Sequence, residues 1–93
     1  MKFRFYIDPE TSEPHVYKHE VKEQEIIEIF TERSYFERIR QDGSFEAIAR
    51  TSSRRYLRIA FRRTEEEFFI ITAYDIEDKE TIAFLEDDYE SNR

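Results

Sequence analysis

The stretch RYLRIAFRR at residues 55–63, followed by EFFIITAYDI at residues 67–76, decides the fold. In the first run, Leu57, Ile59 and Phe61 alternate with polar or small residues, a period of two that is typical of a half-buried β-strand. The second run is almost continuously apolar, as expected for a strand covered on both faces. The link between the runs is short enough for a hairpin, so the two strands are predicted to be antiparallel.

Two further strands are predicted outside this hairpin. Residues 44–51, SFEAIART, alternate in the same way and should pair with the first strand of the hairpin, which gives an antiparallel meander through 44–75. Residues 2–7, KFRFYI, also alternate with period two. Residues 8–15 are predicted to form a turn, and residues 33–43 a connection that ends at the only glycine.

One main helix is predicted over residues 21–32. Ile26, Ile29 and Phe30 share one face at helical spacing, with charged residues between them. The first turn is acidic, which suits the positive end of the helix dipole.

A second, weaker helix is predicted after residue 77, with Asp78 as its N-cap and an acidic segment, 86–93, that is expected to fray. The element order is then β-α-β-β-β-α. The sequence predicts a single α+β domain over residues 1–93, with a small antiparallel sheet and the main helix packed on it. The residues expected in one core are Ile26, Leu57, Ile59, Phe61 and Ile70.

Charge is distributed unevenly along the chain. The formal net charge is -7, yet residues 33–63 hold nine arginines and three acidic residues, a balance of +6. Residues 64–93 hold eleven acidic and two basic residues, a balance of -9. An acidic chain is a poor general nucleic-acid coat protein, but the arginine-rich third leaves room for a local polyanion site. The alternative is that the basic and acidic thirds neutralise each other in the fold.

The arginines gather on one face of the predicted strand at 55–63. Because residues two apart share a face, Arg58 and Arg62 point the same way, with Tyr56 beside them. Tyr74, near the end of the next strand, joins this surface if the register allows. The residues predicted to bind nucleic acid beside this surface are Arg50, Arg54, Arg55 and Tyr56.

Guanidinium groups and phenols on a sheet face suit a phosphodiester backbone. An arginine offers a planar fork that matches two phosphate oxygens, and it keeps its proton. A tyrosine adds a ring for base stacking and a hydroxyl donor. Two alternatives stay open. The arginines could pair with acids of the C-terminal third, in exposed pairs that contribute little to stability, or the face could dock an acidic partner protein.

Three segments resemble those of a known family. The segment KHEVKEQEIIEIF at 18–30, the strand RYLRIAFRR and the run FFIITAYDI at 68–76 resemble the BrnT-type toxins and related small uncharacterised proteins. In that family a Lys-His-Gly-Val segment opens the first helix, and a strand of the form RYLRVVY precedes one ending in Ile-Ser-Ala-Arg or Ile-Thr-Ala-Tyr. The resemblance covers residues 15 to about 76. It implies a RelE-like α+β fold, metal-independent endoribonuclease activity that blocks translation, and neutralisation by a co-encoded antitoxin.

The resemblance also implies roles for single residues. His19 matches the family histidine before the helix, and Arg58 matches an arginine of the basic strand. Tyr74 stands where BrnT-type toxins often have an arginine, and Glu20 replaces the usual glycine. The arginines would stabilise the charge that develops when an RNA 2'-hydroxyl attacks the adjacent phosphate, while the histidine or the tyrosine exchanges protons. The residues expected to be catalytic are His19, Arg58, Arg62 and Tyr74.

Several other chemistries lack support in the sequence. There are no cysteines, so disulfides and thiolate metal sites are excluded. His15 and His19 lie four residues apart without an acidic frame of known spacing, so no metal site is expected, and no cofactor either. With one glycine there is no Gly-rich phosphate loop. No apolar leader segment or membrane-spanning run is present, so we expect a cytoplasmic protein without a membrane partner.

The leading interpretation is a toxin-like endoribonuclease that acts on mRNA, as the toxin of a type II toxin-antitoxin system. Its expected partners are RNA and a cognate antitoxin protein, and the sequence leaves a homo-oligomer open. The alternative is a non-catalytic protein of the same fold that binds a protein partner through the basic sheet face.

Overall fold

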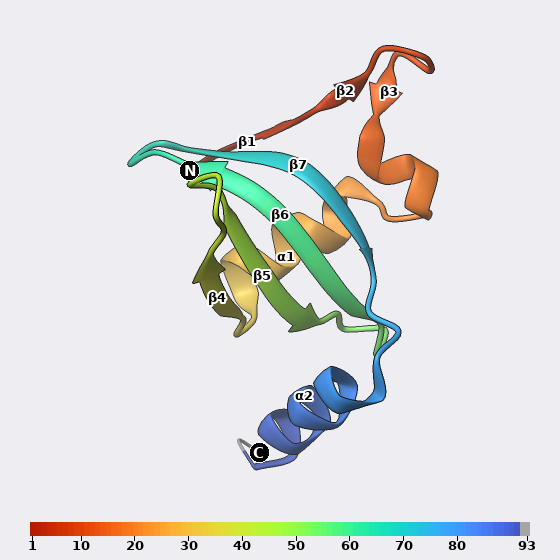
Figure 1. The fold of residues 1–93 in the computed structure, drawn as a ribbon, viewed down its shortest axis with the longest axis vertical. Coiled ribbons are helices and arrows are strands. Elements are labelled where there is room, and N and C mark those ends of the chain that lie inside the picture. Colours follow the sequence, from red (N-terminus) through yellow and green to blue (C-terminus); the bar gives the residue numbers. More distant parts are fainter. Residues whose placement is uncertain (92–93) are drawn as a thin grey trace.

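A five-stranded sheet in the order β1-β7-β6-β5-β4 is the framework of the computed structural model, which describes residues 1–91 (Figure 1). Its strands are β1 (Lys2–Phe5), β4 (Phe36–Ile39), β5 (Phe45–Arg50), β6 (Tyr56–Arg63) and β7 (Glu67–Asp75). A separate hairpin pairs β2 (Ile7–Asp8) with β3 (Glu13–Pro14). The helical elements are the 3-10 helix η1 (His15–His19) and the α-helices α1 (Glu23–Glu32) and α2 (Lys79–Ser91).

The predicted antiparallel meander is confirmed, but the sheet as a whole is mixed. Strands β5, β6 and β7 pair antiparallel, as expected for residues 44–75. Strand β1 instead pairs parallel with β7, so the prediction of an antiparallel sheet is wrong at this edge. Phe3 pairs with Phe68, and their rings stack with centroids 5.2 Å apart. Alternation of apolar residues specifies which face of a strand is buried, but it does not specify the direction in which the strand runs.

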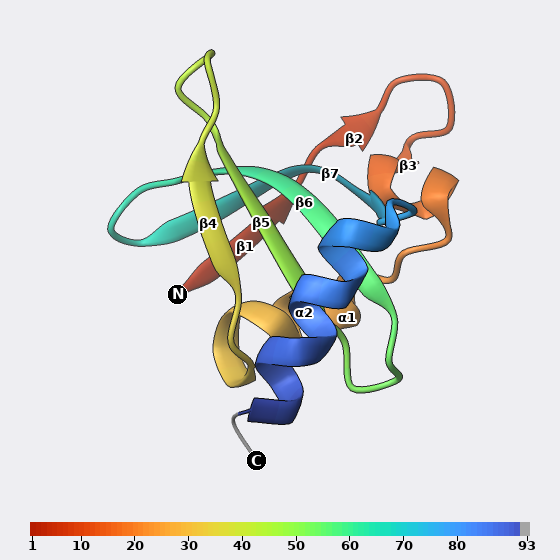
Figure 2. The same ribbon diagram turned by 60° about the horizontal axis from the view of Figure 1, so that its bottom comes forward.

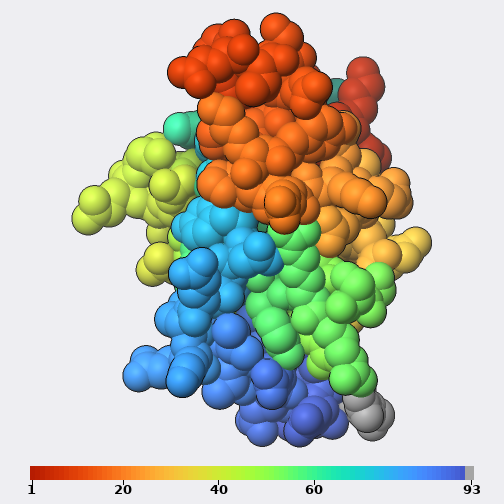
Figure 3. All heavy atoms as spheres, turned by 90° about the vertical axis from the view of Figure 1, so that its right-hand side faces the viewer, coloured from red at the N-terminus to blue at the C-terminus, as the bar shows by residue number. Residues whose placement is uncertain are grey.

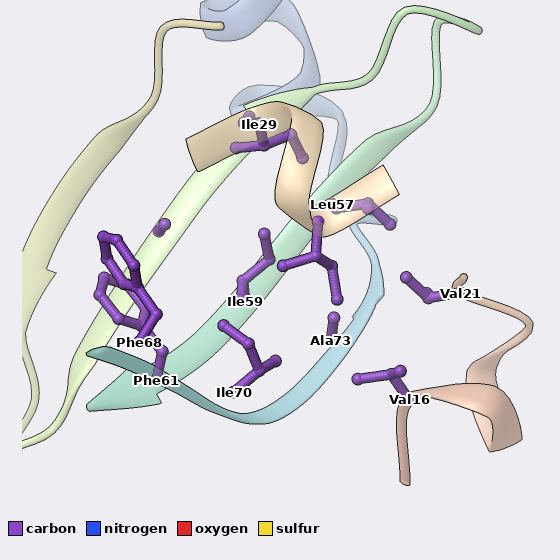
Figure 4. Close-up of a cluster of buried hydrophobic side chains, with 12 residues drawn as sticks. Val16, Val21, Ile29, Leu57, Ile59, Phe61, Phe68, Ile70 and Ala73 are labelled. Carbon is purple, nitrogen blue, oxygen red and sulfur yellow. The ribbon is translucent and has the colours of Figure 1, made fainter. Parts of the chain in front are cut away.

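One face of the sheet packs against α1 and forms the core. Leu57, Ile59 and Phe61 are fully buried there, and Ile26 of α1 and Ile70 of β7 join them, as predicted. Figure 4 shows Leu57, Ile59 and Ile70 on the side of the sheet that faces the helix, together with Ile29 of α1. The main helix therefore forms where its apolar face predicts, and it begins two residues later than expected, at Glu23.

The second helix lies on the opposite face of the sheet, across the ends of β5 and β6 (Figure 2). Leu85 is its fully buried contact, and Phe84 packs on Phe36 of β4 with ring centroids 4.8 Å apart. Asp78 caps the helix as predicted, because its Oδ2 accepts the N–H of Thr81 at 3.0 Å. The helix extends to Ser91, so the acidic segment expected to fray is helical up to that residue, and residues 92–93 lie outside the described residues.

Two elements differ from the sequence-based expectation. The connection predicted over 33–43 contains the edge strand β4, whose four residues are all exposed. Without a buried side, this strand shows no alternation that could reveal it. The strand predicted over 2–7 ends at Phe5, and Ile7 belongs instead to the short β2–β3 hairpin, which occupies most of the turn predicted over 8–15. In residues 1–91 no helix is long and apolar enough to cross a membrane.

Truncation at two isoleucines tests this core. Ile59→Ala should lower the free energy of unfolding by about 2–5 kcal/mol, because Ile59 is fully buried and the shorter side chain leaves a cavity. Ile39 is the matched control, since at 72% exposure the same truncation should change the free energy by less than about 0.5 kcal/mol. Urea unfolding followed by circular dichroism measures both, and equal effects would contradict this assignment of the core.

Candidate active site

An open pocket of about 540 Å³ lies where η1, β6 and the end of β7 meet. In Figure 3 the orange N-terminal segment lies directly against the cyan end of β7 and the green start of β6. Segments that are far apart in the sequence therefore form one concave surface.

Three residues that the sequence predicted to be catalytic line this pocket, namely His19, Arg58 and Tyr74. The antiparallel register places Tyr74 directly opposite Arg58 on the neighbouring strand. The rings of His19 and Tyr74 have centroids 6.0 Å apart. An imidazole, a phenol and a guanidinium thus line one pocket, and together they can exchange protons and bind an anion.

Two carboxylates hold the guanidinium of Arg58. Its Nη1 donates to Glu46 of β5 at 2.6 Å, and its Nη2 lies 3.5 Å from Asp78, which precedes α2. Glu46 also accepts a hydrogen bond from Arg38 of the edge strand at 3.0 Å. Burial alone would raise the pKa of Glu46, but the hydrogen bonds from Arg38 and Arg58 hold it below its ordinary value. The ionised Glu46 therefore fixes Arg58 on the sheet.

The position of His19 depends on Arg55, the residue before β6. Its guanidinium donates to the backbone oxygens of His19 at 2.9 Å and Glu20 at 2.7 Å, and to the carboxylate of Glu25 in α1 at 3.1 Å. It also donates to both carboxylate oxygens of Asp75, at 2.6 and 3.0 Å. These bonds engage all five N–H donors of the group. The guanidinium of Arg55, which the sequence predicted to bind RNA, therefore forms all its hydrogen bonds with other residues of the chain.

A buried carboxylate, Asp8 of β2, holds η1 from its other side. Its Oδ2 lies 2.8 Å from the Lys18 ammonium and 3.0 Å from Nδ1 of His15. Its Oδ1 accepts the backbone N–H of Glu10 at 2.8 Å. The hydrogen bond from Lys18, then those from Glu10 and His15, hold the pKa of Asp8 far below its ordinary value. Lys18 lines the pocket, but its charge is directed at Asp8.

Acidic side chains outnumber basic ones around the pocket. Besides Lys18 and Arg58, its lining includes four carboxylates, those of Glu20, Asp75, Glu77 and Asp78. No group of three or more His, Cys, Asp or Glu residues in the described part of the chain is placed to hold a metal ion. An anionic ligand would therefore depend on the guanidinium of Arg58.

Arg62, the fourth residue expected to be catalytic, lies outside this pocket. It is four residues further along β6, which corresponds to about 13 Å of extended strand. There it lines a separate hollow of about 330 Å³ with Arg4 and Phe69. The structure places Arg58 and Arg62 on one sheet face but does not bring them into one site.

The other residues predicted to bind RNA lie under or beside α2. Arg50, Arg54 and Tyr56 line a small hollow of about 190 Å³ with two acidic residues of that helix, Glu86 and Glu90. Burial, and then the nearby charge of Glu86, raise the pKa of Tyr56 above its ordinary value. The acidic helix α2 therefore borders the surface that the sequence predicted to bind RNA.

Sequence reasoning missed Asp8 and Glu46 as residues of the site. Their contacts with Lys18 and Arg58 join residues ten and twelve positions apart, through a hairpin and a strand register. No local pattern marks such partners. Asp78 was predicted only as a helix cap, and its contact with Arg58 could not be inferred from that role.

The chain matches no protein-family model, and no curated protein and no solved structure is significantly similar to it. The resemblance to the BrnT-type toxins therefore rests only on the three sequence segments at 18–30, 55–63 and 68–76.

Arg55→Ala should lower the free energy of unfolding by about 2–3 kcal/mol, because it removes the donor of two backbone oxygens and one of the two donors to the partly buried carboxylate of Glu25. Arg54→Ala is the control, since the neighbouring Arg54 is exposed and should change stability by less than about 0.5 kcal/mol. Urea unfolding of both variants checks this. A larger loss for Arg54→Ala would contradict the role given to Arg55.

Asp8 should make stability depend on pH in the acid range. A depressed folded-state pKa means that ionised Asp8 stabilises the fold above its unfolded-state pKa of about 3.9. This contribution is lost as the pH falls through the folded-state value. The difference in unfolding free energy between the wild type and Asp8→Asn should therefore shrink between about pH 5 and pH 2. Urea titrations across that range measure the difference, and a constant value would refute the account.

Proposed function

We propose that the chain is a metal-independent endoribonuclease of the BrnT type, acting on mRNA as the toxin of a type II toxin-antitoxin system. The observation that supports this proposal is the meeting of His19, Arg58 and Tyr74 in one open pocket. They come from three different elements, and the sequence singled out each of them separately. A cognate antitoxin is the corresponding partner.

In the proposed reaction the RNA 2'-hydroxyl attacks the adjacent phosphorus, and the 5'-oxygen of the next nucleotide leaves. His19 accepts the proton of the attacking hydroxyl, and Tyr74 donates a proton to the leaving oxygen. Arg58 stabilises the negative charge on the non-bridging phosphate oxygens. The products are a cyclic phosphate and a free 5'-hydroxyl, so no oxidant or reductant is required.

The pairing of Arg58 with Glu46 suits this role. Glu46 is only 11% exposed and binds Nη1 of the guanidinium, while Nη2 lies 3.5 Å from Asp78, which lines the pocket with Arg58. A donor that is already oriented needs no rearrangement when charge develops on the phosphate. Glu46 is therefore a positioning residue for Arg58.

Tyr74→Phe tests the proposal because it removes only a hydroxyl, which makes no hydrogen bond within residues 1–91. The variant should remain folded and should cleave single-stranded RNA about 10²–10⁴ times more slowly than the wild type. Tyr6→Phe is the matched control, since Tyr6 is similarly exposed at 42% and lies outside the pocket. The assay uses purified protein in excess EDTA, with gel analysis of the products.

Growth offers a second readout. Inducing the wild type alone should arrest growth, and Tyr74→Phe should relieve the arrest, while Tyr6→Phe should not. Intact RNA and normal growth with folded wild-type protein would overturn the proposed function.

Binding of a protein partner without catalysis is a second candidate. Glu46 forms ion pairs with both Arg38 and Arg58 and so offsets part of the positive charge of the sheet face. Beside them the rings of Phe36 and Phe84 are 38% and 51% exposed. A sheet face with partly offset charge and exposed aromatic rings suits a protein partner. This candidate predicts that the wild type neither cleaves RNA nor arrests growth.

A further inference from the structure

The two carboxylates that contact Arg58 differ in how firmly they are held. Glu46 is 11% exposed, lies 2.6 Å from Nη1 and is shared with Arg38. Asp78 is 54% exposed, lies 3.5 Å from Nη2 and lines the pocket together with Arg58. The contact between Arg58 and Glu46 joins two strands of the sheet. The contact between Arg58 and Asp78 can break without disturbing the sheet.

The two carboxylate oxygens of Asp78 have different partners. Oδ2 accepts the N–H of Thr81 at 3.0 Å and so caps α2, while Oδ1 faces Arg58. The hydrogen bonds from Thr81, with a smaller effect of Arg58, hold the pKa of Asp78 below its ordinary value. Because the cap needs only one oxygen, the contact with Arg58 can be released while the helix stays capped.

The loop before Asp78 is anchored. Ile76 is 6% exposed, and its N–H donates to the backbone oxygen of Tyr56 at 2.9 Å. Its neighbour Glu77 also lines the pocket but forms no ion pair within residues 1–91. The position of the Asp78 carboxylate beside Arg58 is therefore set by the fold, and the preceding residue, Glu77, offers a carboxylate in the same pocket without that contact.

We propose that the Asp78 carboxylate occupies the place of a phosphate oxygen on Arg58 and competes with phosphate anions for the pocket. The inference rests on the proposed function in that the natural ligand would be the RNA phosphodiester. A phosphate that displaces Oδ1 meets Nη2 of Arg58 in the pocket that also holds His19 and Tyr74. Arginine binds both groups through the same fork of N–H donors. Asp78 is thus an internal competitor that lowers the affinity of the pocket for phosphate.

Asp78→Asn tests the competition, with Glu77→Gln as the matched control. Both substitutions remove one negative charge from the pocket lining, so their long-range effects on an anion are similar. Asparagine keeps the N-cap. The probe is inorganic phosphate, titrated into the full chain and followed by amide NMR shifts. Asp78→Asn should bind phosphate about 5- to 10-fold more tightly than the wild type, and Glu77→Gln less than about twofold more tightly.

A second substitution and a double variant complete the test. Asp78→Ser also caps a helix and carries no charge, so it should reproduce the gain. Adding Arg58→Gln to Asp78→Asn should abolish it. Equal affinities for Asp78→Asn and Glu77→Gln, or no gain in either Asp78 variant, would overturn the inference.

This experiment is independent of cleavage. Tighter phosphate binding by Asp78→Asn with no RNA cleavage by the wild type would overturn the proposed function and support the competition. Cleavage by the wild type with unchanged phosphate affinity in Asp78→Asn would support the proposed function and overturn the competition.

Discussion

The five hydrogen bonds of the Arg55 guanidinium are the constraint on which the rest of the structure depends. They join the start of β6 to the end of η1, to α1 and to the end of β7. The last carbonyls of a helix have no partner within it, and Arg55 satisfies those of His19 and Glu20. Asp8 holds the same 3-10 helix from the other side. The pocket exists because these two contacts fix η1 against the strand ends.

Pairing between distant segments explains why an acidic chain concentrates arginines on one strand and the turn before it. Arg55 and Arg58 are neutralised by carboxylates of β5, α1, the end of β7 and the loop before α2. Some of these acids come from the C-terminal third, as one reading of the charge pattern expected, and others do not. Arg62, by contrast, forms no ion pair in the described part of the chain. In the pocket that His19 and Tyr74 also line, the guanidinium left for an anionic ligand is that of Arg58, whose proposed displaceable partner is Asp78.

Periodicity predicted the meander and α1 because both bury one regular face. Periodicity could not reveal β4, because all four residues of that strand are exposed. It also could not reveal that β1 runs parallel to β7, because the alternation of apolar residues is the same for either strand direction. In the site, the strand pattern anticipated that Tyr74 could join Arg58 if the register allowed, and the register places them opposite each other. The sequence did not reveal Asp8 and Glu46 as partners of Lys18 and Arg58, because long-range ion pairs depend on the assembled fold. The same limit hid the role of Arg55, which looks from sequence like any other arginine of its run.

Hydrogen exchange at the arginine side chains tests the central claim most directly. The Nε–H of Arg55 donates to Asp75 at 2.6 Å, whereas the side chain of the adjacent Arg54 is exposed. Nitrogen-edited NMR should therefore show the Nε–H of Arg55 exchanging with water at least about tenfold more slowly than that of Arg54. Equal exchange rates for the two groups would mean that the Arg55 guanidinium is not held by Asp75 at the end of β7, and the account of the pocket would fail with it.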